Sequence, residues 1–226
     1  MRRKQQLTEA IKTITLLLLV TFLCISSVEA REESNDTSLK EGVSSIQNVQ
    51  SSEASLVLEN GWNFISVPKR LDSTANTAMI FEGVNSDGRS IWTYESDGAG
   101  SGSWITLAST DKITPLNGYW VFSANPVQVP LVYSQDPLAA PPLRDLKTGW
   151  NAIGFASLTP ATARDALLSA KKSWVEIIGF DAKSQSSLPA ILNGGDNMHS
   201  EKSYLTPMQG YWCLVNDSCM YAALTA

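Results

Sequence analysis

Only a few side chains in this sequence are of the types that perform acid-base or nucleophilic catalysis. The chain has a single histidine, His199, which lies in a polar segment with Asp196 and Glu201 close by in sequence. A histidine beside an acid could serve a Ser-His-Asp hydrolase, but no serine stands in the Gly-x-Ser-x-Gly pattern of a nucleophile elbow. The sequence therefore predicts an exposed loop histidine and no catalytic residue.

Acidic residues are scattered rather than paired. Five lie near the ends of predicted strands: Glu95, Asp97, Asp111, Glu176 and Asp181. No two of them form a recognisable carboxylate pair of the kind that hydrolyses glycosides. Residues 85–88 and 193–197 could offer oxygen ligands to calcium, yet neither has the alternating Asp and Asn with a closing Glu of a calcium loop. We expect ordinary turns at both places, with no metal site and no cofactor.

The first thirty residues predict export. A basic start precedes an apolar run from Ile14 to Ile25, and Val28-Glu29-Ala30 fits a small-x-small cleavage site. The apolar run is shorter than the roughly 18 to 20 residues that cross a bilayer comfortably. We expect residues 1–30 to be a signal peptide cleaved near Ala30, so that the chain meets the membrane only during export. An uncleaved signal anchor is the alternative. The mature protein is then extracellular or held at the cell surface.

The charge balance argues against nucleic acid as a partner. The whole chain has a formal charge of −5, and removal of residues 1–30 leaves 13 basic and 20 acidic residues, a charge of −7. A phosphate backbone needs a clustered basic face, whereas Lys171-Lys172 is the only basic pair in a helical context. We expect the partner to be a protein or a glycan of the cell envelope.

Residues 31–55 predict a disordered tether, because Ser, Glu, Gln and Asn dominate and few large apolar residues are present. Two Asn-x-Ser/Thr sequons are candidate glycosylation sites in an exported chain. One begins at Asn35, inside the tether, and the other begins at Asn216. Asn35 is the better acceptor because it lies in the flexible segment.

Cys213 and Cys219 are the two cysteines that remain after removal of the signal peptide. An even number in an oxidising compartment favours one disulfide. If Asn216-Asp217 is the tip of a hairpin, the two cysteines face each other across it, at the short Cβ separation that suits a disulfide. We predict a Cys213–Cys219 bridge, with two buried free thiols as the alternative.

Two motifs occur twice in the chain. Residues 61–65 (GWNFI) return 88 residues later as GWNAI, and residues 114–120 (TPLNGYW) return 92 residues later as TPMQGYW. The near-equal intervals indicate a tandem duplication with a few residues of loop insertion. We predict two homologous modules, residues 56–133 and 144–226, joined by a Pro-rich linker over residues 134–143. We expect linked beads, although the short linker would also permit the modules to pack together.

Each module is predicted to be β-rich with one short helix, which gives a mainly β (α+β) fold class. Alternating apolar residues predict strands at 62–67, 90–94, 103–107 and 175–180. Hairpins are expected at 56–67, 119–133 and 211–223. Helices are expected at 75–81 and at 160–170, the second capped by Thr159.

Tryptophan offers the clearest candidate for a ligand contact. Six of the seven tryptophans lie in or beside core-like strand motifs and are expected to pack inside. Trp104 differs, because it follows a Gly-rich loop at residues 95–102 and has no counterpart in the second module. We single out Trp104 as a possible exposed contact to a ligand such as a sugar.

The combination of Gly-Trp-Asn-x-Ile-Ser-x-Pro, a short helix, an aromatic strand and Thr-Pro-Leu-x-Gly-Tyr-Trp resembles tandem repeat modules in exported and cell-surface proteins of methanogenic archaea and some bacteria. The resemblance covers about residues 56–226, and the second copy departs from it where Gly154-Phe155-Ala156 replaces Ser66-Val67-Pro68. It implies residence in the envelope or outside the cell and a structural or interaction role, with no catalytic residues to carry over.

We therefore expect a non-enzymatic protein that displays variable loops, namely residues 83–90, 95–104 and 181–202, to a partner. An extracellular carbohydrate-binding module that uses Trp104 is the first alternative. A secreted hydrolase is the second.

Overall fold

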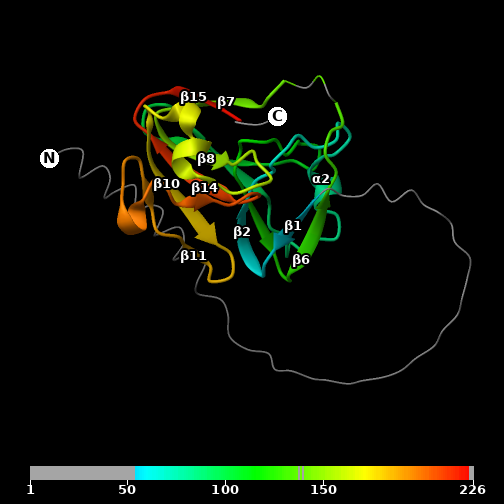
Figure 1. The fold of residues 1–226 in the computed structure, drawn as a ribbon. Coiled ribbons are helices and arrows are strands. Elements are labelled where there is room, and N and C mark those ends of the chain that lie inside the picture. The colour runs from blue at the N-terminus through cyan, green and yellow to red at the C-terminus, as the bar shows by residue number, and fades with distance from the viewer. Residues whose placement is uncertain (1–53, 137, 139, 224–226) are drawn as a thin grey trace, which may run out of the picture. The chain divides into compact units, whose positions relative to one another are not determined.

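The structure is a computed structural model that describes residues 54–136, 138 and 140–223, and the described chain is mainly β, as expected (Figure 1). The predicted signal peptide, almost all of the predicted tether and the sequon at Asn35 lie outside the described residues. Strand β1 begins at Ala54, two residues before the expected start of the first module. None of the helices in the described part is long and apolar enough to cross a membrane.

The strands of the N-terminal half, residues 54–133, form two sheets. The strands are β1 (Ala54–Leu58), β2 (Gly61–Ile65), β3 (Trp92–Ser96), β4 (Gly102–Thr106), β5 (Tyr119–Ser123) and β6 (Val127–Leu131). β1 pairs antiparallel with β6, while the other four form a sheet in the order β2-β5-β3-β4. Thus β1 and β2 do not pair with each other, and neither do β5 and β6. The hairpins expected at residues 56–67 and 119–133 are therefore wrong, because the chain changes sheet at both corners.

The C-terminal half, residues 142–223, has a similar pairing pattern with more short strands. The strands are β7 (Leu143–Leu146), β8 (Gly149–Gly154), β9 (Ala161–Thr162), β10 (Trp174–Asp181), β11 (Ser186–Ser187), β12 (Ile191–Leu192), β13 (Tyr204–Leu205), β14 (Gly210–Val215) and β15 (Cys219–Ala222). β7 pairs with β15, and a second sheet has the order β11-β10-β14-β8, with β12 also on β10. β9 pairs with β13. The hairpin expected at residues 211–223 is likewise wrong, since β14 and β15 belong to different sheets.

The Gly-Trp-Asn motif makes the corner between two sheets. Gly61 and Gly149 have φ angles of 101° and 103°, a backbone conformation that residues with a Cβ rarely adopt. Two residues on, the buried Asn63 amide accepts from the Glu59 N–H at 2.8 Å and donates to the Glu59 carbonyl at 2.9 Å. Asn151 makes the same two bonds to the backbone of Lys147, at 3.1 and 2.8 Å. The motif therefore closes a turn instead of presenting its amide to a ligand.

Both predicted helices are present and are shorter than expected. α2 (Thr77–Ile80) is capped by Asn76, whose side chain accepts from the Met79 N–H at 3.0 Å. α3 (Ala163–Ala166) is capped by Thr162 rather than Thr159, and the 3-10 turns η1 (Leu168–Ala170) and η2 (Asn197–His199) follow in this half. Capping side chains at these positions satisfy backbone N–H groups that a short helix leaves unpaired.

Each half has its own hydrophobic core. In β1, Leu56 and Leu58 are buried while Ser55 and Val57 are exposed, which is the alternation of a strand with one face inward. The N-terminal core consists of Leu56, Leu58, Ile65, Val67, Ile80, Ile113, Tyr119, Val121, Val129, Leu131 and Tyr133. The C-terminal core contains Leu116, Leu146, Ile153, Phe155, Leu167, Trp174, Ile177, Ile191, Leu205, Tyr211, Cys213, Val215 and Tyr221, with buried alanines between them.

A third, mainly aromatic core joins the two halves. Its buried members are Phe64 from β2, Ala152 from β8, Phe180 from β10 and Trp212 from β14. Phe64 stacks on Trp120 at 4.5 Å with an interplanar angle of 8°, and its centroid is 5.5 Å from that of Trp212. Residues 54–223 thus form one packed unit, and the halves are not separate beads on a linker.

The second repeated motif also lies at this joint. In each half the tyrosine hydroxyl accepts from the N–H of a threonine five residues earlier, Thr114 to Tyr119 at 3.1 Å and Thr206 to Tyr211 at 2.6 Å. The glycine before each tyrosine faces the other half, where a Cβ on Gly118 would be 2.8 Å from a backbone oxygen. The motif therefore needs glycine because two backbones approach closely.

Each half also inserts one side chain into the other. Leu116 and Met208 both have a φ of 65°, in the left-handed region that non-glycine residues seldom occupy. Leu116 belongs to the core of the C-terminal half, and Met208 packs against the core of the N-terminal half. Single β-bridges, Ile65 to Gln209 and Asn117 to Ile153, fix the two crossings. The exchange makes each core depend on a residue of the opposite half.

Candidate functional site

Trp104 lies on β4, the edge strand of its sheet, and is 38% exposed. The neighbouring Ile105 is 41% exposed, so the strand presents apolar surface. Behind it, the Trp104 ring packs edge to face with Tyr94 and Trp212, with centroids 5.5 and 5.6 Å apart. Trp104 is therefore accessible and also held in one orientation, which suits an aromatic contact to a ligand. Its role as a ligand contact stays a prediction.

Part of the loop before Trp104 contacts the C-terminal half. Ser96 Oγ donates to the Thr148 carbonyl at 2.8 Å. A Cβ on Gly149 would be 3.4 Å from the Gly100 Cα, so the tip of this loop lies against the corner of the C-terminal half. The segment expected to be displayed freely at 95–104 is thus anchored across the joint, and only its outer side is open to a partner.

A second expected display loop, residues 181–202 of the C-terminal half, contacts the N-terminal half. Gln185 Oε1 accepts from the Trp62 N–H at 2.8 Å, and Gln185 Nε2 donates to the Trp62 carbonyl at 2.9 Å. The amide lies beneath Gly61, where a Cβ would approach it to 2.6 Å. Gln185 therefore pairs with an edge strand of the other half much as a neighbouring strand would. Within the described residues, the third loop, 83–90, has its side-chain contacts inside its own half, through Asp87 and Arg89.

His199 does not form part of a recognisable catalytic group. Its Nδ1 lies 2.7 Å from the carbonyl oxygen of Ala190. Glu176 is near enough to interact with it electrostatically; burial raises the pKa of Glu176, and His199 lowers it. No serine hydrogen-bonds to this histidine within the described residues. Glu201 instead accepts from the Gly194 N–H at 2.9 Å.

The other acids singled out from the sequence mostly shape turns. Asp97 accepts from the N–H groups of Ala99 and Ser101, and Asp111 from the N–H of Ala108. Hydrogen bonds from Ser184 and from the Lys183 backbone lower the pKa of Asp181. No group of three or more His, Cys, Asp or Glu that could hold a metal occurs among the described residues.

The predicted Cys213–Cys219 disulfide is not supported, because both residues are free cysteines in the structure. Cys213 is buried on β14, between β8 and β10, whereas Cys219 begins β15, which pairs with β7. The prediction placed them opposite each other in one hairpin, and the chain instead passes from one sheet to the other between them. Burial raises the pKa of the Cys213 thiol, which keeps it protonated and unreactive.

Asn216, the described glycosylation candidate, is exposed in the turn between β14 and β15. Its backbone N–H donates to the Ser173 carbonyl at 2.9 Å, while Ser218 accepts from the Thr148 N–H at 3.2 Å. The side chain is thus accessible, and glycosylation there stays a prediction.

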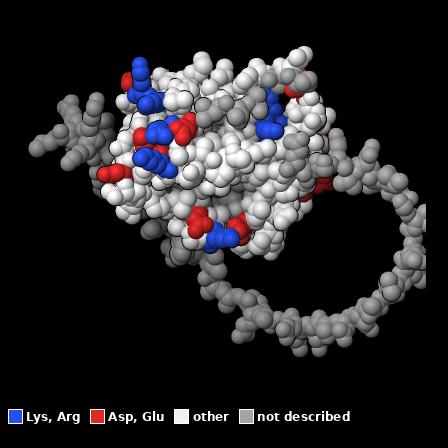
Figure 2. Space-filling view, in the orientation of Figure 1, with Lys and Arg blue, Asp and Glu red and all other residues white. Residues whose placement is uncertain are grey.

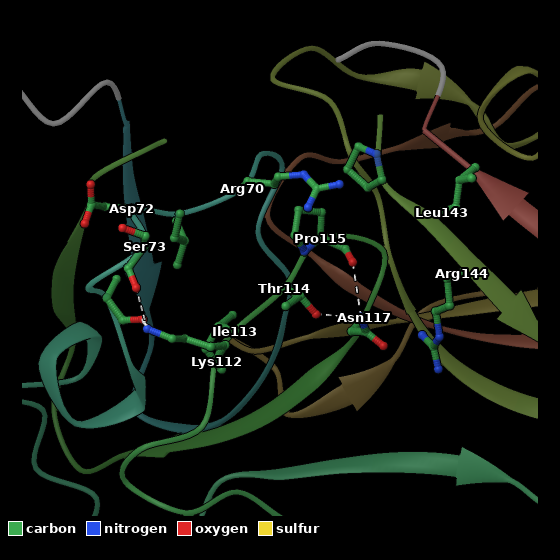
Figure 3. Close-up of a pocket in the computed structure, with 13 residues that line it drawn as sticks. Arg70, Asp72, Ser73, Lys112, Ile113, Thr114, Pro115, Asn117, Leu143 and Arg144 are labelled. Carbon is green, nitrogen blue, oxygen red and sulfur yellow. Dashed lines mark hydrogen bonds between the residues drawn. The ribbon is translucent and has the colours of Figure 1, made fainter. Parts of the chain in front are cut away.

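Sequence reasoning missed a pocket of about 430 Å³ that lies where the halves meet (Figure 3). Three chain segments line it: residues 70–75 after β2, residues 112–117 before β5, and residues 142–144 at the start of β7. Three cationic side chains, Arg70, Lys112 and Arg144, contribute to the lining, with a single acid, Asp72. No contiguous motif marks this site, because its residues come from separate loops.

Arg144 is the most unusual residue of the pocket. Its Nη1 donates to the carbonyls of Leu116, at 2.9 Å, and Ala152, so the side chain bridges the two halves. Burial lowers the pKa of its guanidinium. No carboxylate forms an ion pair with it in the described part of the chain. A charge that is withdrawn from water without an opposite charge is costly, which makes this position a candidate for function.

The surface charge is mixed. On the face shown in Figure 2, basic and acidic side chains are interspersed, and much of the surface carries neither. Two ion pairs among the described residues are exposed and local, Arg89 with Asp87 and Arg164 with Asp165, and a third, Lys183 with Glu59 at 3.7 Å, crosses between the halves. Such pairs contribute little to stability.

Comparison of the chain with protein-family models, with curated proteins and with solved structures finds no match to any of them.

Proposed function

We propose that this chain is a non-enzymatic, exported or cell-surface interaction protein, built from two copies of one β-rich module. The observation that carries the proposal is where the repeated residues lie. Asn63 and Asn151 close corners between sheets, while Leu116 and Met208 each enter the opposite core. The residues that recur therefore serve the architecture of a rigid platform, and the surface that differs between the halves is left for a partner.

The matching geometry of the halves supports the duplication. β1 with β6 and β7 with β15 form equivalent two-stranded sheets, and the β2-β5-β3 order has its counterpart in β8-β14-β10. The two φ angles of 65° and the two crossing β-bridges fall at corresponding residues of the second motif. Export is proposed from residues 1–30 and is tested by sequencing the N-terminus of protein recovered outside the cell, where Arg31 is expected.

The partner is proposed to be a protein or glycan of the cell envelope, not a nucleic acid. The experiment is retention of the purified exported protein on envelope fractions from its source, with the retained components identified, alongside a glycan array. Specific retention on an envelope protein supports the proposal. Absence of retention on every envelope component and on every glycan would overturn it.

A carbohydrate-binding module is the second candidate, and the exposure of Trp104 favours it. Trp104→Ala is the informative variant, and Tyr204→Ala is its matched control, because Tyr204 is 67% exposed and lies on β13 in the other half. Glycan binding that Trp104→Ala abolishes and Tyr204→Ala preserves would establish this alternative. Hydrolase activity has the least support, since His199 has no described serine partner.

A further inference from the structure

We propose that the pocket lined by Arg70, Lys112 and Arg144 binds the oxyanion group of a small acidic ligand, about the size of one sugar unit. This site is distinct from the Trp104 surface and goes beyond the proposed function. It assigns a ligand class to the joint between the halves, whether or not the outer surface binds an envelope component.

The pocket has the size and lining of a ligand site. Its volume of about 430 Å³ falls in the range of roughly 300 to 1,000 Å³ that is usual for small-molecule sites. Leu71, Ile113, Pro115, Pro142 and Leu143 supply apolar walls. Thr114 and Asn117 add polar groups between them, and Figure 3 shows Asn117 close to the side of the pocket occupied by Arg144. A carbon skeleton could therefore lie against the apolar side chains while an acidic group meets one of the two arginines.

The charge of the lining is positive although the chain as a whole is acidic. The lining contains three cations and one carboxylate, whereas the whole chain has a formal charge of −5; Figure 3 shows Lys112 turned toward Ser73, away from the two arginines. The carboxylate does not neutralise the cations by contact: Asp72 Oδ1 accepts from the N–H and the hydroxyl of Thr74, at 2.8 and 2.6 Å. Lys112 Nζ donates to the carbonyls of Ser73 and Ala75, both at 2.7 Å, which holds the loop at the pocket wall.

The two arginines keep donors available. Arg70 Nη2 donates to the Ala140 carbonyl at 2.8 Å, and Arg144 uses only Nη1 for its two carbonyl contacts. The Nε and Nη2 groups of Arg144 have no hydrogen-bond partner among the residues that the structure describes. In Figure 3 the Arg70 guanidinium lies beside Pro115 and the Arg144 guanidinium lies apart from it, on the Asn117 side of the pocket. Paired N–H donors of this kind match the geometry of a carboxylate or a phosphate.

The N-terminal half shows which residue occupies the position that corresponds to Arg144. β1 and β7 both end at a fully buried leucine, Leu58 and Leu146. Two residues earlier, Leu56 lies opposite Val129 in the first half, and Arg144 lies opposite Tyr221 in the second. An apolar pair closes the first location, so a fold of this kind does not require an arginine there.

Arg144 could instead serve only as a link between the halves through its carbonyl contacts. In that case replacing Arg144 would change the stability of the protein and would have no effect on ligand binding. The variant Arg144→Leu copies Leu56 and separates the two roles, because leucine can fill apolar space and cannot bind an anion. Arg70 is exposed, so Arg70→Gln tests the same site with little risk to folding.

The test is titration of the purified protein with glucuronate, glucose 6-phosphate and glucose, followed by calorimetry. We expect saturable binding of at least one acid and none of glucose; the preferred acid shows whether a carboxylate or a phosphate is the natural group. Arg144→Leu and Arg70→Gln should each weaken that binding by about tenfold or more. Arg164→Gln, which removes an exposed cation outside the pocket lining, should leave the binding affinity unchanged.

Several outcomes would overturn the site. These are no saturable binding of either acid, equal binding of glucose, unchanged affinity in both pocket variants, or an equal loss in Arg164→Gln. If Arg144→Leu does not fold, Arg70→Gln decides alone. Because none of these readouts involves Trp104 or an envelope fraction, failure here is distinguishable from failure of the proposed function.

Discussion

Leu116 and Met208 stand at matching places in the two halves, yet the opposite half encloses them to different degrees. Leu116 is fully buried as a member of the C-terminal core, while Met208 is partly exposed at the margin of the N-terminal core. Gln185 supports the Gly61 corner with side-chain hydrogen bonds to Trp62, and Ser96 supports the Gly149 corner with one to the Thr148 carbonyl. Each half thus supports a corner of the other, and the C-terminal core depends more on its inserted residue because Leu116 is the more enclosed.

The largest expected effect comes from the core that the halves share. Phe64→Ala should lower the free energy of unfolding by about 3–5 kcal/mol, because Phe64 is 3% exposed and stacks on Trp120. Urea denaturation monitored by tryptophan fluorescence measures it, and a single transition is expected since both halves lose the same support. Val57→Ala, at a 55% exposed position, should change stability by less than about 0.5 kcal/mol. Two separate unfolding transitions, with one half as stable as before, would show that the halves do not share this core.

The second prediction tests the asymmetry directly. Leu116→Ala should cost about 2–5 kcal/mol, since it opens a cavity in a fully enclosed site. Met208→Ala should cost less, because part of its side chain already faces solvent. Both variants keep a residue with a Cβ at a φ of 65°, so backbone strain is equal and cancels in the difference. Equal costs, or a larger cost at Met208, would contradict the asymmetry.

The third prediction concerns the Gln185 contact. Gln185→Ala leaves the half-buried Trp62 N–H and carbonyl without their partner, which should cost about 1–3 kcal/mol. Hydrogen exchange at the Trp62 amide should become faster as well. Lys183→Gln is the control, because the Lys183 side chain is 77% exposed and its contact with Glu59 is long, at 3.7 Å. Unchanged exchange at Trp62 would show that the contact is dispensable.

The smallest effect is expected where the second half has cysteines in place of valines. Cys213→Val copies the aligned Val121, and both positions are buried, so the change should be under about 1.5 kcal/mol. Were the two cysteines bridged, the same variant would cost about 2–5 kcal/mol. In the native protein iodoacetamide should modify Cys219 before Cys213, because Cys213 is the more deeply buried. Intact mass after denaturing alkylation without reductant should show both thiols modified.

Sequence periodicity predicted where the strands lie better than it predicted which strands pair. The repeated motifs correctly indicated strands at β2, β5, β8 and β14. Proximity in the chain suggested hairpins, but the chain enters a different sheet after β1, after β5 and after β14, and sequence alone does not distinguish such a corner from a hairpin turn. The predicted disulfide is not supported because it rested on the hairpin at residues 211–223.

Of the two candidate sites, one could be predicted from the sequence and the other could not. Trp104 could be chosen because it is a tryptophan without a counterpart, and its exposure agrees with that choice. The pocket could not be chosen by motif, because residues 70–75, 112–117 and 142–144 meet only after the halves pack. One signal was present in the spacing of the repeated motifs: Arg144 lies 88 residues after Leu56, the interval of the Gly-Trp-Asn motif, so a charge stands where a core residue would be expected.

The exchange of Leu116 and Met208 also sets the timing of folding. β1 can pair with β6 once residue 131 has been made, but Met208 reaches the first core only some 75 residues later. At a synthesis rate of about 5–20 residues per second, that delay is roughly 4–15 seconds. During it the first half presents an incomplete apolar surface to its surroundings. A chain arrested between these points is therefore expected to be far more prone to aggregation and proteolysis than the finished protein.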